Sequence, residues 1–140
     1  MAVQIMKHLG AEVTGVCSTS NLEMVRNLGA DYVIDYTKQN LLPEGVKYNF
    51  ILDSVGKMKT SKLKDSCKES LVRNGKYLSV DDASLKLDSK RLNKIKEYIE
   101  AGYIKPIIDK CFTLDEIVEA HRYVEKGHKR GGVAITISNE

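Results

Sequence analysis

Hydrophobic and polar residues along the chain follow two spacings in turn, one typical of helices and one typical of strands. Residues 1–9 carry apolar side chains on one helical face, and Gly10 follows them as a helix stop. Residues 12–17 then form a short run with Val13, Thr14 and Val16, residue types that favour a strand. This alternation of helix and strand continues to about residue 80, so the pattern predicts an α/β fold.

Within this first region, apolar runs and turn residues predict the order of the elements. Asn21 is a suitable N-cap for a helix that stops at Gly29, and Asn74-Gly75 indicates a turn. The apolar run at 49–55 is typical of a strand buried on both faces. Such an order favours a doubly wound parallel sheet with helices on both faces. The other expected elements are a strand at 32–35, a loop at 36–47, a helix at 60–72 and a strand at 76–80.

After residue 81 the pattern changes, and a second unit is expected. Ser89 can cap a helix whose apolar face, with Leu92, turns inward. Thr113 and Glu116 have the spacing of a capping box, and an alternating strand at 132–138 closes the chain. We therefore expect a boundary near residue 103 and two units, 1–103 and 104–140.

Composition narrows the functional classes. The 140 residues contain 42% hydrophobic and 29% charged residues, ordinary values for a soluble domain. The net charge of +3 comes from 22 basic and 19 acidic residues and is too balanced for a nucleic-acid binder. Lysines between residues 57 and 68 surround an amphipathic helix and are expected to form its solvated face. No apolar run approaches the roughly 20 residues of a membrane span, so no membrane partner is expected.

Cysteine and histidine usage argues against disulfides and metal sites. The three cysteines are odd in number and far apart, which fits reduced thiols and predicts a cytoplasmic protein. The three histidines are equally scattered and form no metal-binding motif, and His121 lies on an apolar helix face, where a core histidine is expected. Cys67 and Cys111 are expected to pack as small hydrophobic residues.

Six segments carry a specific signature through their order and spacing. They are AVQIMKHLGAEVTGVCST at 2–19, VRNLGADYVIDY at 25–36, FILDSVG at 50–56, NGKYLSV at 74–80, EAGYIKPIID at 100–109 and FTLDEIVEAHRYVEKGHKRGGVAITI at 112–137. Together they resemble the C-terminal half of the medium-chain dehydrogenase/reductase family, in particular its quinone oxidoreductase and zinc-type alcohol dehydrogenase-like members. The resemblance covers nearly the whole chain.

The resemblance implies a truncated Rossmann-like domain followed by a segment that returns to the catalytic domain. Residues 1–103 would be part of the dinucleotide-binding domain, and 104–140 the return segment. The first strand, the glycine-rich turn, the substrate pocket and any zinc ligands would lie outside the chain. The implied activity is NADP-dependent hydride transfer between nicotinamide and a small carbonyl, alcohol, enone or quinone. We expect this chain alone to be inactive, and we place no catalytic residue in it.

The C-terminal end of the 12–17 strand is expected to decide between NAD and NADP. An acidic residue there would accept hydrogen bonds from the ribose hydroxyls and repel a 2′-phosphate. Residues Cys17-Ser18-Thr19 offer no carboxylate, which favours NADP with Ser18, Thr19 and Asn21 as donors. The alternative is that Ser18 to Asn21 only cap a helix. Tyr36 resembles a family tyrosine that covers this region. Two residues of the tail could add positive charge, Lys129 and Arg130.

A second group of candidates follows the next two strands, at the sheet edge that lines the ligand crevice of an open α/β fold. Asp53, Val55 and Gly56 end the first of these strands, and glycine lets the backbone approach a cofactor closely. Ser79 and Val80 end the second, near the nicotinamide in a complete enzyme. The alternative is an ordinary turn after a strand.

Association is the last expectation. In the strand order 3-2-1-4-5-6 the absent strand would be central, so strands 12–17 and 49–55 would each keep an unpaired edge. Either these two strands pair directly, or another chain fills the gap. The strand at 132–138 adds a further edge, which predicts a homodimer through it. A non-catalytic nucleotide-fold or assembly module is the alternative to a fragment of an oxidoreductase.

Overall fold

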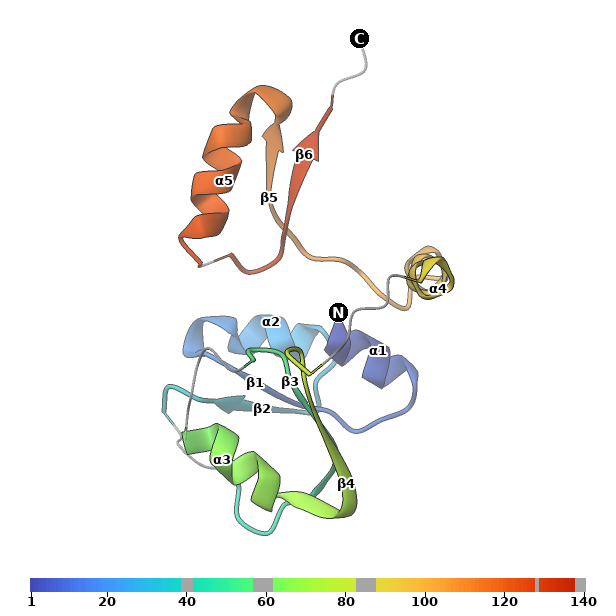
Figure 1. Ribbon diagram of the computed structural model, residues 1–140, viewed down its shortest axis with the longest axis vertical. Helices are drawn as coiled ribbons and strands as arrows, with labels where there is room; N and C mark the ends of the chain where they lie inside the picture. Colours follow the sequence, from blue (N-terminus) through green and yellow to red (C-terminus); the bar gives the residue numbers. More distant parts are fainter. Residues whose placement is uncertain (39–41, 57–61, 83–87, 128, 138–140) are drawn as a thin grey trace.

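The computed structural model describes residues 1–38, 42–56, 62–82, 88–127 and 129–137 (Figure 1). In the first unit the elements are α1 Ala2–His8, β1 Thr14–Cys17, the 3-10 helix η1 Thr19–Asn21, α2 Leu22–Asn27, β2 Tyr32–Asp35, β3 Tyr48–Asp53, α3 Lys62–Glu69 and β4 Leu71–Ser79. They are followed by α4 Ser89–Glu100, β5 Ile108–Thr113, the 3-10 helix η2 Leu114–Glu116, α5 Ile117–Glu125 and β6 Gly132–Thr136. Helices and strands alternate as the hydrophobic pattern predicts.

All strand pairing among the described residues is parallel. β1 pairs with β2, and Cys17 at the end of β1 lies opposite Asp35. β3 pairs with β4, and Asp53 lies opposite Ser79. β5 pairs with β6 around α5, in the upper part of Figure 1. Parallel pairs joined through helices confirm the expected α/β class.

The three strand pairs remain separate two-stranded sheets in the described part of the chain. β1 and β3 are not hydrogen-bonded to each other, so the two strands expected to flank a gap do not close it by direct pairing. Each therefore keeps one edge without a strand partner among the described residues. Such an edge presents a row of backbone donors and acceptors that another strand could use.

The stretch between α3 and β4 differs from the expectation. The helix expected at 60–72 is shorter, and residues 60 and 61 lie outside the described residues. Asn74-Gly75 is part of β4 instead of a turn, because Leu71 already pairs with Tyr48 and the register shifts before Phe50. At Gly75 a side chain would come within 3.0 Å of the Tyr48 carbonyl oxygen, so this irregular stretch favours glycine.

The expectation that 49–55 is buried on both faces is wrong. Phe50 and Leu52 remain 41% and 40% exposed, and Leu78, opposite Leu52 on β4, is 41% exposed. These side chains share one face of the β3–β4 pair, since alternate residues of a strand point the same way. That face is apolar, as a buried surface would be, but its side chains are exposed to solvent.

Helix ends are confirmed at several glycines, while one of the expected caps is wrong. Gly29 has a φ of +98°, as expected for a helix stop. α4 is capped by the Asp88 carboxylate, which accepts from the Lys90 N–H at 2.9 Å, and not by Ser89. Asn21 stands at the N-cap of α2, as predicted, although its side chain makes no capping bond. The predicted Thr113–Glu116 box is confirmed by a 2.9 Å bond from the Thr113 N–H to Glu116 Oε2.

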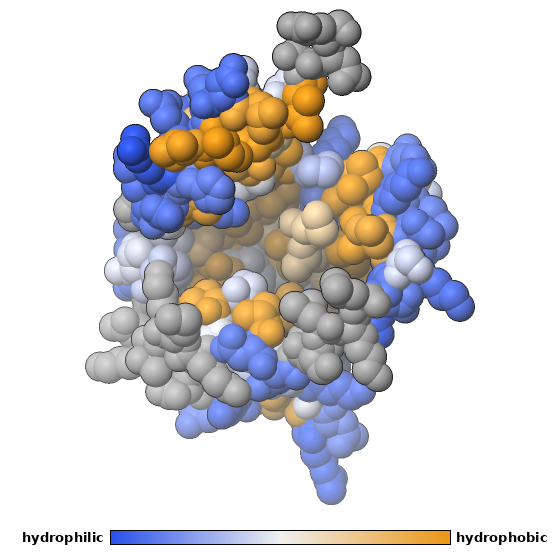
Figure 2. Space-filling view, turned by 45° about the horizontal axis from the view of Figure 1, so that its top comes forward, coloured by the Kyte–Doolittle hydropathy of each residue, from blue (hydrophilic) through white to orange (hydrophobic). Residues whose placement is uncertain are grey.

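The core is small for a chain of this size. Accessible surface totals 10,982 Å², whereas a compact monomer of 15.7 kDa would expose roughly 7,300 Å². Leu92 is 68% exposed, and Cys111 and His121 are exposed rather than in the core, so three burial predictions are wrong. Hydrophobic residues gather on the β5–α5–β6 unit and around the hollow beneath it (Figure 2). Among the described residues, the buried hydrophobic ones are Cys17, Val25, Ile34, Ile104, Phe112 and Ala120.

Gly15→Ala is expected to lower the free energy of unfolding by roughly 1–3 kcal/mol through overpacking. α2 lies so close to β1 that a Cβ at position 15 would stand 2.4 Å from Val25 Cγ1. Gly132→Ala is the matched control, since its Cβ would meet the Ile107 carbonyl oxygen at an ordinary 3.6 Å. Chemical denaturation of both variants measures the difference. Equal midpoints for the two would contradict the packing argument.

Candidate dinucleotide-binding site

The turn after β1 presents two neighbouring hydroxyl groups. Ser18 Oγ and Ser20 Oγ are 3.2 Å apart, and Asn21 Nδ2 donates to Ser18 Oγ at 3.2 Å. The amide of Asn21 is therefore turned back onto the turn itself, and its Oδ1 is buried without a hydrogen bond from the described residues. One of the two serine hydrogens lies in the Ser18–Ser20 bond, so the pair keeps one hydroxyl hydrogen that a ligand on this turn could accept.

Thr19 is engaged differently, by a carboxylate that the sequence analysis did not place here. Asp35 at the end of β2 is 8% exposed, and its Oδ2 accepts from Thr19 Oγ1 at 2.5 Å. Thr37 donates to Asp35 Oδ1 through its hydroxyl at 2.6 Å and its N–H at 2.9 Å. The hydrogen bonds from Thr19, and next from Thr37, hold the pKa of Asp35 below its usual range. Asp35 is thus an anion behind the turn.

Tyr36 lies beside this turn, as expected. Its N–H donates to the Cys17 carbonyl at 3.1 Å, which extends the β1–β2 pairing by one residue. The Tyr36 side chain is 52% exposed. Burial, and then the charge of Asp35, raises the pKa of the Cys17 thiol, so this residue is a neutral part of the core.

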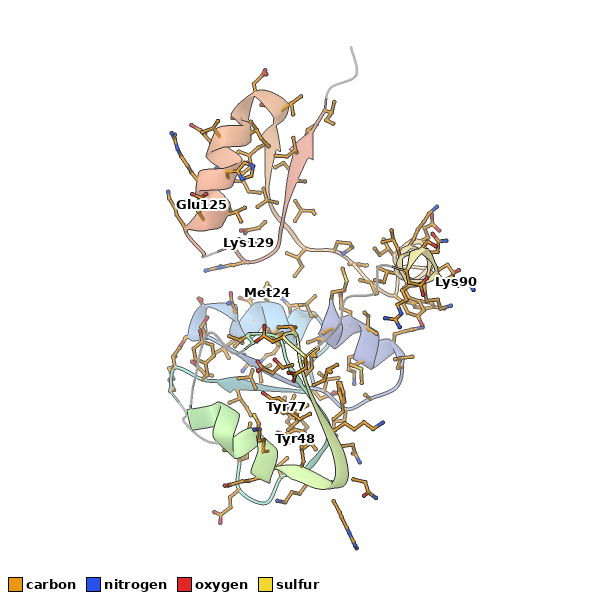
Figure 3. All side chains as sticks on the ribbon, in the orientation of Figure 1. Met24, Tyr48, Tyr77, Lys90, Glu125 and Lys129 are labelled. Carbon is orange, nitrogen blue, oxygen red and sulfur yellow. The ribbon has the colours of Figure 1, made fainter. Side chains whose placement is uncertain are left out.

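The C-terminal unit brings positive charge to the same region. A cleft of about 480 Å³ separates it from α1 and α2, and Arg130 lines this cleft together with Ser20 and Glu23. The Arg130 N–H donates to Asp109 Oδ2 at 3.0 Å, which fixes the backbone at the rim. Figure 3 shows Lys129 on the side of the C-terminal unit that lies over α2 with Met24, and its Nζ donates to the Gly131 carbonyl at 3.5 Å. Lys105 also lines the cleft, so its basic residues outnumber the single acid.

The second group of candidates meets at Asp53, the last residue of β3. Asp53 Oδ1 accepts from the N–H groups of Val55 and Gly56 at 3.0 and 3.1 Å. Its Oδ2 accepts from Tyr77 at 2.9 Å and from Ser79 at 3.4 Å. Burial first, and then the bond to Asp53, raises the pKa of Tyr77 to about 12. The carboxylate therefore shapes the turn after β3.

Exposure separates the residues of this second group. Ser79 is 3% exposed and supports Asp53 from within, whereas Val55 and Val80 are 60% and 47% exposed and lie at the surface. Gly56 has a φ of +77°, and a Cβ there would come within 2.5 Å of an Asp81 oxygen. Tyr77, labelled in Figure 3, is a second residue, after Asp35, that sequence analysis missed. A tyrosine two residues before the end of a strand was the available signal.

Metal chemistry finds no support in the part of the chain that the structure describes. No group of three histidine, cysteine, aspartate or glutamate side chains could hold an ion there. The three cysteines are free. No step through zinc is therefore derived for this chain.

Comparison with protein families decides the assignment of the chain. Residues 1–80 match one family model described as zinc-binding dehydrogenase, and residues 82–135 match a second model with the same description. The chain belongs to the zinc-binding dehydrogenase family. The resemblance to medium-chain dehydrogenases and reductases seen in the sequence is thereby confirmed.

Individual relatives agree with this assignment. NADPH-dependent alkenal/one oxidoreductase, chloroplastic, from Arabidopsis thaliana is 30% identical over 96% of this chain and 36% of its own length. NAD(P)H oxidoreductase RTN4IP1, mitochondrial, from Bos taurus is 34% identical over 97% of this chain and 44% of its own length. The structure of the quinone oxidoreductase from Coxiella burnetii superposes with a TM-score of 0.74 at 19% identity, covering 98% of this chain and 48% of the other.

The structural likeness confirms the Rossmann-like fold class. The chain spans less than half the length of each of these three proteins. None of the helices in its described residues is long and apolar enough to cross a membrane. The unit boundary at residue 103, the site residues and the partner surface stay predictions.

Proposed function

We propose that this chain supplies the adenosine-side binding surface of an NADPH-dependent oxidoreductase. The reaction is hydride transfer between nicotinamide and a small carbonyl, alcohol, enone or quinone. The observation that carries this proposal is the hydroxyl-bearing turn at Ser18 and Ser20 beside the cleft lined by Arg130. The Arabidopsis relative, named as NADPH-dependent, supports the same cofactor.

The residues of the turn fit a 2′-phosphate on the adenosine ribose. The Ser18–Ser20 pair donates its remaining hydroxyl hydrogen, and the Arg130 guanidinium supplies a charge-assisted bond from across the cleft. Tyr36, exposed beside the turn, covers the adenosine. Thr19 and Asn21, whose hydrogens are turned inward, hold the turn in shape. Lys129, near the same cleft, adds longer-range attraction.

The nicotinamide half of the cofactor runs along the ends of β3 and β4. Val55, Gly56 and Val80 line this edge, while Asp53 and Ser79 fix the turn beneath it. NADPH, when bound, supplies the hydride. The chain's own part is to bind and orient the cofactor, and no residue of the chain is assigned to proton transfer. Residues 104–140 then belong to the catalytic domain, and residues 1–103 to the dinucleotide-binding domain.

Titration of the 140-residue chain with NADPH and NADH tests this function. NADPH is expected to bind tighter by about tenfold, because a charge-assisted bond to phosphate contributes roughly 1.5–3 kcal/mol. Absolute affinity is expected in the high micromolar range or weaker, by estimate. Arg130→Ala should remove most of the preference, whereas Lys126→Ala, which loses the same charge at the end of α5, should retain it. Equal affinities of the unmodified chain for the two cofactors would contradict the assignment.

A non-catalytic assembly module is the second candidate function. The surface of 10,982 Å², far above the roughly 7,300 Å² of a compact monomer, favours a chain built to be covered by other protein. The two candidates differ in ligand binding, since a module would bind neither dinucleotide. Cytoplasmic localisation also stays a prediction, and the names of the two curated relatives place those proteins in chloroplasts and mitochondria.

A further inference from the structure

Asp35 lies at the candidate site, although no pattern in the sequence predicts a role for it there. It ends β2, it is 8% exposed, and its carboxylate lies directly behind the turn proposed to bind the 2′-phosphate. The oxygens of Thr19 and Thr37 flank it and are 2.9 Å from each other. The three side chains form a compact triangle, in which both threonine hydroxyls donate to the carboxylate.

Counting hydrogens shows what this triangle offers to a ligand. Each threonine hydroxyl has one hydrogen, and an ionised carboxylate has none. Thr19 and Thr37 both donate to Asp35, so their hydrogens point inward. The outer surface of the triangle then presents only acceptor oxygens. Acceptors suit the 2′-hydroxyl of an unphosphorylated ribose, which can donate, and oppose a phosphate, which accepts.

Charge acts in the same direction. The carboxylate of Asp35 is little exposed, so solvent screens it less than a surface charge. A 2′-phosphate beside Thr19 would lie one hydroxyl group away from this anion and would be repelled. Ser18, Ser20 and Arg130 attract the phosphate from the other side of the turn. The preference of the site is thus a balance between two opposed sets of groups.

We propose that Asp35 is a positioning residue that limits the preference of this site for a 2′-phosphate, by turning the hydroxyl hydrogens of Thr19 and Thr37 inward and by its own negative charge. This inference rests on the proposed function. It concerns the degree of discrimination and not the presence of the site. Asparagine at position 35 removes the charge, and its amide group would turn one threonine hydrogen outward.

Adenosine 2′,5′-bisphosphate and adenosine 5′-monophosphate are suitable probes, because they differ only in the 2′-phosphate. Calorimetric titration of the 140-residue chain gives the ratio of their affinities. For Asp35→Asn this ratio should rise by about five- to tenfold in favour of the bisphosphate. The affinity for the monophosphate should change less than twofold. If Asp35 had a purely structural role, the Asp35→Asn variant would instead bind both ligands more weakly by the same factor. That result would overturn the inference.

Asp31→Asn is the matched control. Asp31 precedes β2 and Asp35 ends it, so the same charge is removed roughly 13 Å away, beyond the screening length at physiological salt. The ratio of bisphosphate to monophosphate affinity in Asp31→Asn should equal that of the unmodified chain. An equal rise in both variants would show a general effect of net charge and would overturn the inference.

Thr19→Val keeps the inference testable if Asp35→Asn does not fold. Because the Thr19 hydrogen points to Asp35, loss of the hydroxyl should leave bisphosphate affinity within about twofold. A loss of about tenfold, the effect of a direct donor, would overturn the inference. Failure of the unmodified chain to bind either probe would overturn the proposed function and this inference with it. An unchanged ratio in a chain that does bind overturns the inference alone.

Discussion

The purified 140-residue chain is expected to oxidise NADPH no faster than buffer does, whether the acceptor is a quinone, an enone or an aldehyde. Its sequence contains no G-x-G-x-x-G turn to hold the pyrophosphate at a helix N-terminus. The crevice also stays open, since β1 and β3 are not paired in the described residues. Without a held pyrophosphate, contacts at the adenosine end and along the ends of β3 and β4 do not fix the distance between the nicotinamide and an acceptor. Hydride transfer needs reacting atoms held about 3–3.5 Å apart.

Absorbance of NADPH, followed with protein freed of host enzymes, measures this result. Arg130→Ala, purified in parallel, is the control for contamination: a trace host enzyme would give the same rate in both preparations. A rate above about 1 per second in the unmodified chain, lost in Arg130→Ala, would show an active enzyme and contradict the expectation.

Local pattern was sufficient for most elements of the fold. β2 spans Tyr32–Asp35 as predicted, and helices end near the predicted glycines because only a residue tolerant of positive φ ends them so sharply. Asn74-Gly75 misled because the dipeptide is typical of turns. Pairing of Leu71 with Tyr48, 23 positions earlier in the chain, keeps that stretch extended, and such a long-range contact leaves no local signal.

Burial was harder to predict than element type. An apolar pattern shows which face of a strand or helix favours burial, but the partner that covers it is a property of the whole assembly. Phe50 and Leu52 carry the pattern of a buried strand and are about two-fifths exposed. Leu92 on α4 and Leu114 on η2 show the same mismatch. These residues therefore mark surfaces that are expected to be covered.

In the candidate site, too, some features could be predicted from the sequence and others could not. The neutral turn at Ser18 was readable from sequence, because it follows a strand directly. The role of Asp35 was not, because it meets Thr19 across a separation of 16 residues. Tyr77 and Asp53 meet across 24 residues. In both pairs a carboxylate at a strand end accepts hydrogen bonds from hydroxyl groups of the neighbouring strand or turn.

The chain is expected to be a homodimer or larger assembly at tens of micromolar, with β6 as the leading contact. β6 pairs only with β5 among the described strands, so its second edge is open to a strand from another copy. Ile137, just after β6, is 69% exposed, and Ile108 on β5 is 52% exposed. Residue 138, the last of the predicted 132–138 strand, lies outside the described residues.

Area makes this association energetically reasonable. The excess over a compact monomer is roughly 3,700 Å², more than the 1,200–2,000 Å² that a stable interface buries from both partners. Ile137→Lys should weaken the assembly, because it places a charge where the second copy would pack. Leu92→Lys is the matched control, since Leu92 is 68% exposed on α4, outside the proposed contact, and should leave the assembly intact.

Size-exclusion chromatography with light scattering distinguishes the outcomes. The expected result is a mass of about twice 15.7 kDa or more for the unmodified chain and for Leu92→Lys, with Ile137→Lys shifted toward the monomer. Equal effects of the two lysine variants would instead indicate general hydrophobic association, with the open edges of β1 and β3 as the next candidates. A stable 15.7 kDa monomer that unfolds sharply on heating would contradict association altogether. It would mean that the chain tolerates the open edges of β1, β3 and β6 in solution.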